Sequence, residues 1–221
     1  KEYMAALLTS ILDNTNKVIE YIEECGRLGI KVLPPRINES GEGFTVTPEG
    51  IRFGLLAVKN LGAGVIREVI AQREENGPFA SFLDFYRRMY GGELNKRSVE
   101  SLIKSGALDG LGANRRQMLE GYPKAGEVLA ARERWQSSGQ ISLFGDEPDE
   151  EELALPLIDE DDPSLLLAGE KEVTGLYISG HPMSHYEPLY RQYGAVKLIH
   201  LTDPDTNQSY DNASVYLMGM I

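Results

Sequence analysis

A glycine-rich turn that leads into a helix is the feature of this chain best suited to chemistry, and that chemistry is the binding of anions. The turn runs from Lys59 to Gly64, and the helical pattern of residues 65–75 follows it. Such a helix start offers unpaired backbone N–H groups and the positive end of the helix dipole. Glycine permits a close approach to the backbone, and Asn best replaces glycine in a left-handed conformation. The expected contacts to a phosphate backbone are Lys59, Asn60, Gly62, Ala63, Gly64 and Arg67.

A second turn of the same kind follows about 45 residues later. It begins Gly106-Ala107-Leu108, so it lacks the final glycine of the motif, and predicted helices over 97–104 and 114–120 flank it. Two such units form a weak tandem helix-hairpin-helix repeat. The expected phosphate contacts here are Lys104, Gly106, Arg115 and Arg116. The alternative is that both turns only pack a small helical domain.

The pentapeptide Gln140-Ile141-Ser142-Leu143-Phe144 lies between two glycines and precedes a strongly acidic stretch. An apolar tip on a polar tether is typical of a docking peptide. Leu143 and Phe144 would fill an apolar pocket, and the amide of Gln140 would bond to its polar edge. The other interpretation is a short strand packed on its own domain.

The sequence shows no catalytic motif, because neither a nucleophile motif nor a phosphate-binding P-loop occurs in it. The histidines, His181, His185 and His200, favour no metal site, since Pro182 breaks the helix that would align the first two. The single cysteine, Cys25, is expected to be a buried thiol in a reducing cytoplasm. We therefore expect neither catalytic residues nor a metal site.

The net charge of -12 argues against nucleic-acid binding only until it is divided along the chain. Residues 1–140 hold 19 basic and 18 acidic residues, whereas residues 141–221 hold 3 and 16. Within the first part, residues 52–134 carry 14 basic and 10 acidic residues, so a locally basic segment is available for DNA. Residues 146–162 contain ten acidic residues and no basic one, which predicts a solvated linker.

Periodicity predicts a mainly helical α+β fold that would position these turns. An extended run over 30–33 and a β-hairpin of 44–46 with 51–53 are also predicted, and the aromatic residues of 79–89 are expected to be core. No apolar run is long enough to span a membrane. The first residue is Lys and the last seven form an apolar strand pattern, so we expect a piece of a longer protein. The predicted helices are 4–12, 16–28, 55–59, 65–75, 79–89, 97–104, 114–120 and 125–136.

Five sequence blocks, in order, resemble the alpha subunit of bacterial DNA polymerase III, a replicative polymerase of the C family. They are residues 3–10 (YMAALLTS), 33–40 (LPPRINES), 51–62 (IRFGLLAVKNLG), 102–109 (LIKSGALD) and 175–182 (GLYISGHP). The resemblance implies four segments. Residues 1–50 would end the fingers domain, and residues 51–136 would form a tandem helix-hairpin-helix module on duplex DNA. Residues 137–164 would hold the clamp-binding peptide and an acidic linker. Residues 165–221 would form a connector and the start of an OB-fold, whose first strand would be residues 213–221.

The same resemblance implies partners and a reaction for the parent protein. Residues Gln140 to Phe144 would dock on the sliding clamp, which is the beta subunit of the replicase. The chain would also contact primer-template DNA, and the parent protein would contact other replicase subunits. This assembly would work in the cytoplasm, and no membrane partner is expected. The parent would be a DNA-directed DNA polymerase that uses Mg²⁺, and its catalytic aspartates would lie upstream of Lys1. This chain would then be inactive alone and bind no cofactor itself. The alternatives are a stand-alone helix-hairpin-helix scaffold or DNA-repair accessory protein, and an interaction module that binds no DNA.

Overall fold

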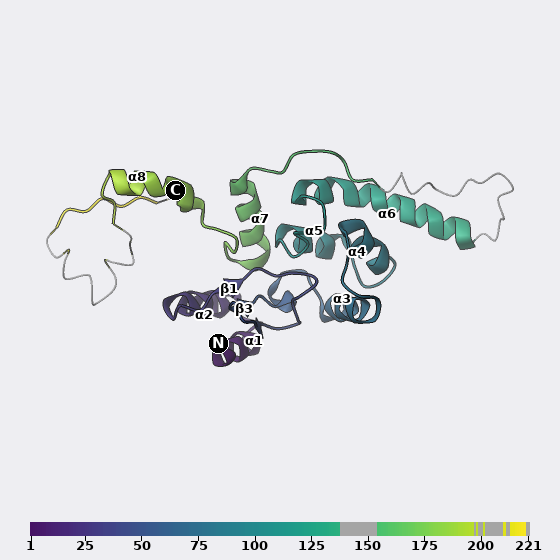
Figure 1. Cartoon of the computed structure of the whole chain (residues 1–221), viewed down its shortest axis with the longest axis horizontal. Coiled ribbons are helices and arrows are strands. Elements are labelled where there is room, and N and C mark those ends of the chain that lie inside the picture. Colours follow the sequence, from purple (N-terminus) through teal and green to yellow (C-terminus); the bar gives the residue numbers. More distant parts are fainter. Residues whose placement is uncertain (138–153, 197, 199–200, 202–209, 211–212, 220–221) are drawn as a thin grey trace. The chain divides into compact units, whose positions relative to one another are not determined.

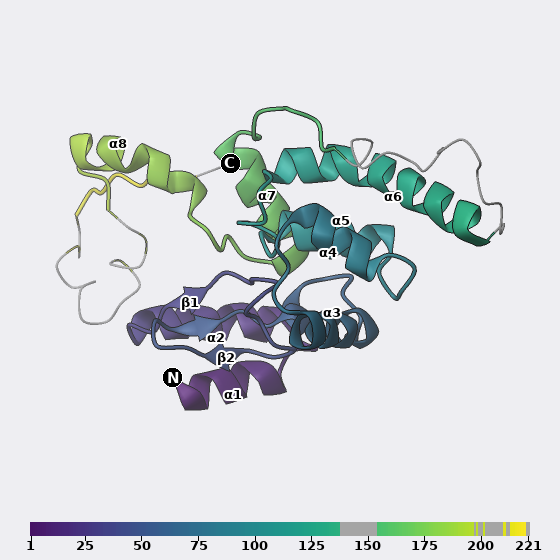
Figure 2. The same ribbon diagram turned by 45° about the vertical axis from the view of Figure 1, so that its right-hand side comes forward.

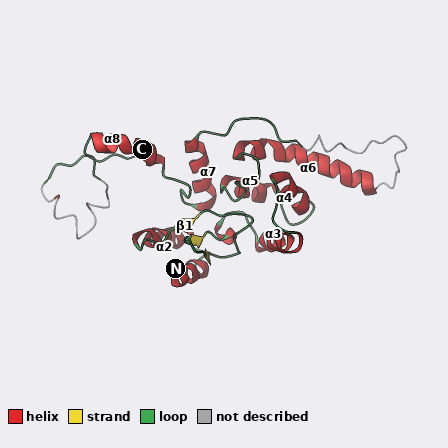
Figure 3. Ribbon diagram, in the orientation of Figure 1, coloured by secondary structure: helices red, strands yellow, loops and turns green. Residues whose placement is uncertain are grey.

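The computed structural model describes residues 1–137, 154–196, 198, 201, 210 and 213–219 of the chain (Figure 1). These residues divide into two compact units, residues 1–178 and residues 179–221. The predicted fold class is confirmed, because helices dominate and one small sheet accompanies them (Figure 3).

Helices make up most of the first unit, and they fall close to their predicted positions. One prediction is wrong: residues 114–120 and 125–136 form a single helix that contains Pro123. Its buried residues Met118, Tyr122, Ala125 and Leu129 follow a helical spacing across the proline, so packing holds the helix together despite the lost hydrogen bond. The elements are α1 (Glu2–Ser10), α2 (Thr15–Arg27), the 3-10 helix η1 (Leu55–Ala57), α3 (Ala63–Asn76), α4 (Phe82–Met89), α5 (Lys96–Lys104), α6 (Arg115–Ser137) and α7 (Pro163–Thr174).

The sheet has three short strands, β1 (Val32–Leu33), β2 (Thr45–Val46) and β3 (Ile51–Arg52), in the order β1-β3-β2. Strands β2 and β3 form the predicted antiparallel hairpin, and β1 pairs parallel to β3. Helix α1 lies beside β2 and helix α2 beside β1 (Figure 2).

One hydrophobic core extends across the boundary predicted at residue 50. It joins Leu8 and Ile37 to Phe53, Phe85 and Leu102, all buried. The side chain of Asn38 also exchanges two hydrogen bonds with the backbone of Phe79, at 3.0 and 2.9 Å. Packing therefore does not separate the segment 1–50 from the segment that follows it.

Over its described part, residues 154–162, the acidic stretch is largely exposed, yet it contacts the first unit at several points. Leu155 packs against the core, and the side chain of Asn114 donates to the carbonyl of Ile158 at 2.9 Å. Helix α7 then buries Val173 in the same core. The predicted linker is thus attached at Leu155, Ile158 and Glu160, which accepts from the N–H of Arg115, while Leu157 and Asp159 face solvent.

The second unit contains the 3-10 helix η3 (Pro182–Tyr186) and α8 (Glu187–Gln192). The N–H of Val196 donates to the carbonyl of Tyr216 at 2.9 Å, and the hydroxyl of Tyr190 donates to the carbonyl of Met218. Residues 213–219 form no strand, so the strand predicted over 213–221 is not seen in its described part. A strand needs a ladder of bonds to a partner, and Val196 supplies a single bond.

Within the described parts of both units, no helix is long and apolar enough to cross a membrane.

Candidate nucleic-acid interface

The first hairpin is formed by the turn between η1 and α3, and Asn60 shapes it. Asn60 has a φ of +63°, the left-handed conformation expected for it. Its side-chain amide donates to Ser101 Oγ at 3.0 Å, and its carbonyl accepts from Ser98 Oγ at 2.9 Å. Both serines are buried on α5, so this helix fixes the conformation of the turn on its buried side.

The start of α3 is open. Gly62 precedes the helix in an extended conformation, with φ of −79° and ψ of 154°, and no side chain caps it. Among the described residues, no acceptor takes the N–H groups of Ala63, Gly64 and Val65. Gly62 and Ala63 are exposed, so the positive end of the helix faces solvent. The carboxylate of Glu93 lies close enough to meet any side chain placed at Gly64, but it accepts none of these N–H groups.

Two exposed basic residues flank this opening, as predicted from the spacing. Lys59 donates from Nζ to the carbonyl of Glu172 at 2.8 Å, and Arg67 donates from Nε to the carbonyl of Ala63 at 3.2 Å. Both bonds end on neutral carbonyls, so neither bond neutralises the positive charge.

The first turn of α5 carries two more exposed basic residues, Lys96 and Arg97, which were not among the phosphate contacts expected from the sequence. They come directly before Ser98, which bonds to the carbonyl of Asn60. This tertiary contact brings α5 to the first hairpin. The local sequence carries no signal for it beyond the basic pair.

The second hairpin is packed more tightly than the first. Gly106 has a φ of +75°, and Ala107 is buried. The carbonyls of Ala107 and Leu111 accept from the N–H groups of Ile37 and Phe82, at 2.8 and 3.0 Å. This turn therefore holds distant parts of the core together.

The side chain of Arg115 does not face solvent, so its guanidinium is not placed for the predicted DNA contact. Only 9% of its side chain is exposed, and it pairs with Asp109 at 2.7 Å and with Glu170 at 3.0 Å. Glu170 is itself buried and also accepts from the N–H of Ile178. Burial alone would lower the pKa of Arg115, but the two carboxylates raise it. The guanidinium thus serves as a buried cross-link between the second hairpin and α7.

The other basic residues of the second hairpin also have acidic neighbours. Lys104 pairs with the carboxylate of Glu172 at 2.8 Å, and Arg116 lies 3.7 Å from that of Asp161. The side chains of Asn114 and Gln117 each accept the other's backbone N–H, which is a capping box at the start of α6. The helix start that was expected to bind phosphate is therefore already capped.

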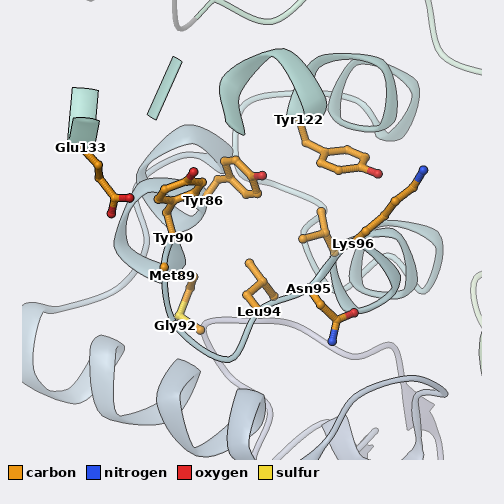
Figure 4. Close-up of a pocket in the computed structure, with 11 residues that line it drawn as sticks. Tyr86, Met89, Tyr90, Gly92, Leu94, Asn95, Lys96, Tyr122 and Glu133 are labelled. Carbon is orange, nitrogen blue, oxygen red and sulfur yellow. The ribbon is translucent and has the colours of Figure 1, made fainter. Parts of the chain in front are cut away.

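A pocket of about 350 Å³ lies between α4, α5 and α6 (Figure 4). Tyr86, Tyr90 and Tyr122 line it, with Lys96 and Glu133 among its other residues. Burial, together with a hydrogen bond to Glu100, raises the pKa of Tyr122 to about 12. The prediction that the aromatic residues of 79–89 are core is confirmed for the three phenylalanines; Tyr86, only partly buried, lines the pocket instead.

The predicted clamp-binding peptide, residues 140–144, lies outside the described residues. Where side chains are described, no group of three or more His, Cys, Asp or Glu residues could hold a metal ion.

The open turn of the first hairpin, fixed between helices, is the geometry of a helix-hairpin-helix motif, and that family matches residues 29–118. The chain is similar to proteins named DNA polymerase III subunit alpha. It is 39% identical over 228 residues to that of Saccharopolyspora erythraea, covering 100% of this chain and 19% of the relative. It is 44% identical over 190 residues to that of Thermus aquaticus (85% and 15%), and 34% identical over 224 residues to that of Vibrio cholerae (100% and 19%). The chain belongs to the DNA polymerase III alpha subunit family, and it spans less than a fifth of the length of these relatives.

Proposed function

We propose that this chain is the part of a replicative DNA polymerase that holds the backbone of duplex DNA through its first hairpin. The observation that carries the proposal is the uncapped start of α3 behind the left-handed Asn60. Exposed N–H groups at a helix start bind a phosphate oxygen, and Lys59 and Arg67 add charge beside them. Contacts of this kind carry no sequence information, so the binding is independent of base sequence.

The substitution Gly62→Leu tests this site with little cost to the fold. A side chain at Gly62 meets nothing within 4 Å, and the φ of −79° suits any residue. It would nevertheless stand over the N–H groups that a phosphate must reach. We expect duplex affinity at low salt, measured by fluorescence anisotropy, to fall about tenfold, the equivalent of one lost contact of about 1.4 kcal/mol.

The matched control is Gly26→Leu, which adds the same side chain to another exposed glycine with open space around it. Thermal unfolding of both variants checks that the fold is intact. Equal duplex affinity for the two variants would overturn the proposal for the first hairpin.

A second test uses ionic strength, because phosphate contacts release counterions. The substitution Lys59→Glu should weaken duplex binding and reduce the slope of log affinity against log salt by about one. The control Lys17→Glu makes the same charge change at an exposed residue of α2. An unchanged slope for Lys59→Glu, or an equal change for both variants, contradicts backbone binding at this hairpin.

We further propose that residues 140–144 dock this chain on a sliding clamp. The support is the sequence pattern of an apolar pair beside Gln140 and the similarity to polymerase subunits. Tethering to a ring around DNA makes rebinding effectively intramolecular, so processivity requires no tight grip on phosphate.

The double substitution Leu143→Ala with Phe144→Ala should abolish binding to a bacterial sliding clamp in calorimetry. The control pair Leu157→Ala with Leu165→Ala removes two exposed leucines, which are 97% and 60% exposed, elsewhere on the chain. Clamp affinity that survives the first pair contradicts the docking role.

The polymerase reaction itself is proposed for the whole protein. The side chains described here include no acidic cluster that fits metal ions, so no step of phosphoryl transfer is assigned to them. We propose that Mg²⁺ and the catalytic aspartates belong to other parts of the polymerase, that this chain is inactive alone, and that the polymerase works in the cytoplasm with the other replicase subunits.

A further inference from the structure

A carboxylate of the chain itself occupies the start of helix α6. The N–H of Arg115 donates to Glu160 Oε2 at 2.9 Å, and the N–H of Arg116 donates to Glu160 Oε1 at 3.1 Å. Two successive backbone N–H groups thus hold two oxygens of one anion. A helix start holds two oxygens of a phosphate in the same way.

Electrostatics keep Glu160 in its charged form. Burial raises the pKa of its carboxyl group, but hydrogen bonds from the N–H groups of Arg115, Asp161 and Arg116 outweigh this and lower it. Glu160 is therefore an anion under the conditions in which DNA is bound.

The segment that carries Glu160 is attached at several points. Its Ile158 carbonyl accepts from the side chain of Asn114 at 2.9 Å, Asp161 lies 3.7 Å from the guanidinium of Arg116, and Leu155 packs against the core. Glu160 itself is exposed. The contact is therefore at the surface, where a phosphate can reach it.

We propose that Glu160 occupies the phosphate site of the second hairpin and competes with duplex DNA for it. This inference rests on the proposed function, since the first hairpin brings the duplex to the molecule. Displacement of Glu160 frees the N–H groups of Arg115 and Arg116. The half-exposed guanidinium of Arg116, 3.7 Å from Asp161, adds positive charge beside them, while the side chain of Arg115 stays buried. The ligand of the uncovered site is a phosphodiester of the DNA backbone.

The substitution Glu160→Ala tests the competition. We expect duplex affinity at low salt to rise about fivefold and the salt slope to steepen by about one, as for one added phosphate contact. The matched control is Asp159→Ala, which removes the same charge from the neighbouring exposed residue and should raise affinity less than about twofold. A gain no larger than that of the control overturns the inference.

Two further variants separate competition from damage to the fold. Glu160→Gln keeps an oxygen acceptor for the helix start but removes the charge, so it should give a smaller gain in affinity than Glu160→Ala and a smaller loss of unfolding temperature. Glu160→Ala with Arg116→Ala should lose most of the gain; a full gain in this double variant means that the added affinity does not arise at the second hairpin.

The two proposals fail in different ways. If Gly62→Leu weakens duplex binding and Glu160→Ala does not strengthen it, the first hairpin binds DNA and the inference about Glu160 is wrong. If Gly62→Leu has no effect while Glu160→Ala strengthens binding through Arg116, the second hairpin is the phosphate site and the proposal for the first is wrong.

Discussion

The two hairpins share a left-handed residue and a following helix, yet they differ in what lies at the start of that helix. At the first hairpin, the N–H groups of Ala63 and Gly64 meet no acceptor among the described residues. At the second, Asn114, Gln117 and Glu160 satisfy the corresponding groups of α6. A glycine turn before a helix therefore leaves backbone N–H groups open to an external anion only where nothing else caps the helix.

The basic residues of the two hairpins differ in the same way. Arg67, one turn into α3, is exposed, whereas Arg115, at the start of α6, is buried between two carboxylates. An arginine with a buried carboxylate partner contributes to the fold, and one that faces solvent is available to a ligand. Substitutions at matched positions can test each part of this contrast.

The largest difference is expected for the two arginines. Arg115→Ala leaves Glu170 buried without its guanidinium, which should lower the free energy of unfolding by about 3–5 kcal/mol. Arg67→Ala removes an exposed side chain and should change it by no more than about 0.5 kcal/mol. Chemical denaturation measures both.

The double substitution Arg115→Met with Glu170→Met removes the pair together and should recover most of the loss, because no buried charge remains. A loss below about 1 kcal/mol for Arg115→Ala would show that the pair is not a cross-link of the fold.

The next effect concerns the glycines of the two turns. Gly106 has a φ of +75°, and an added Cβ would run into the guanidinium of Arg115. We expect Gly106→Ala to destabilise the chain by about 1–3 kcal/mol. Gly62 has a φ of −79° and open space around it, so Gly62→Ala should change the free energy of unfolding by no more than about 0.5 kcal/mol in the same experiment. Equal costs would mean that the two turns are under the same constraint.

Asn60 provides a smaller, more local test of the first hairpin. Asn60→Ala loses the bond to Ser101 and puts alanine, which tolerates the left-handed conformation less well than asparagine, at this position, so it should cost about 1–2 kcal/mol of unfolding free energy. Asn60→Gly loses the same bond without the conformational cost, so it should cost about half as much. If the glycine variant is the less stable of the two, the left-handed backbone is not what Asn60 contributes.

These contrasts also show what the sequence could predict. The left-handed turn at Asn60 and the helix after it follow from local rules, and the structure confirms both. The burial of Arg115 does not, because its partner Glu170 lies 55 residues away in the chain. Glu160, the anion at the start of α6, lies 44 residues from Arg116, inside a stretch whose composition is that of a solvated linker.

Composition alone could not predict how that stretch is attached, and the reason is physical. Average charge predicts hydration, but it does not record that Leu155 can reach the core or that one carboxylate meets two N–H groups. The same limit applies to α6, where a buried stripe outweighs the helix-breaking tendency of Pro123. Local rules place the hairpins correctly, and only tertiary contacts decide which of them is open.

The smallest effect is a dependence on pH that should appear at one hairpin and not at the other. Because the folded-state pKa of Glu160 is lowered, its contribution to stability is fully present above its ordinary pKa of 4.5 and is lost as the pH falls through the lowered value. The amide of Arg116 should therefore lose its protection from hydrogen exchange below that pH, relative to the intrinsic exchange rate. The amide of Gly64, which no acceptor among the described residues takes, should show little protection at any pH.

Asp161 and Asp109 also lie near these arginines, so Glu160→Gln serves as the control: the pH dependence at Arg116 should disappear in this variant. If the dependence persists in that variant, another carboxylate holds the start of α6.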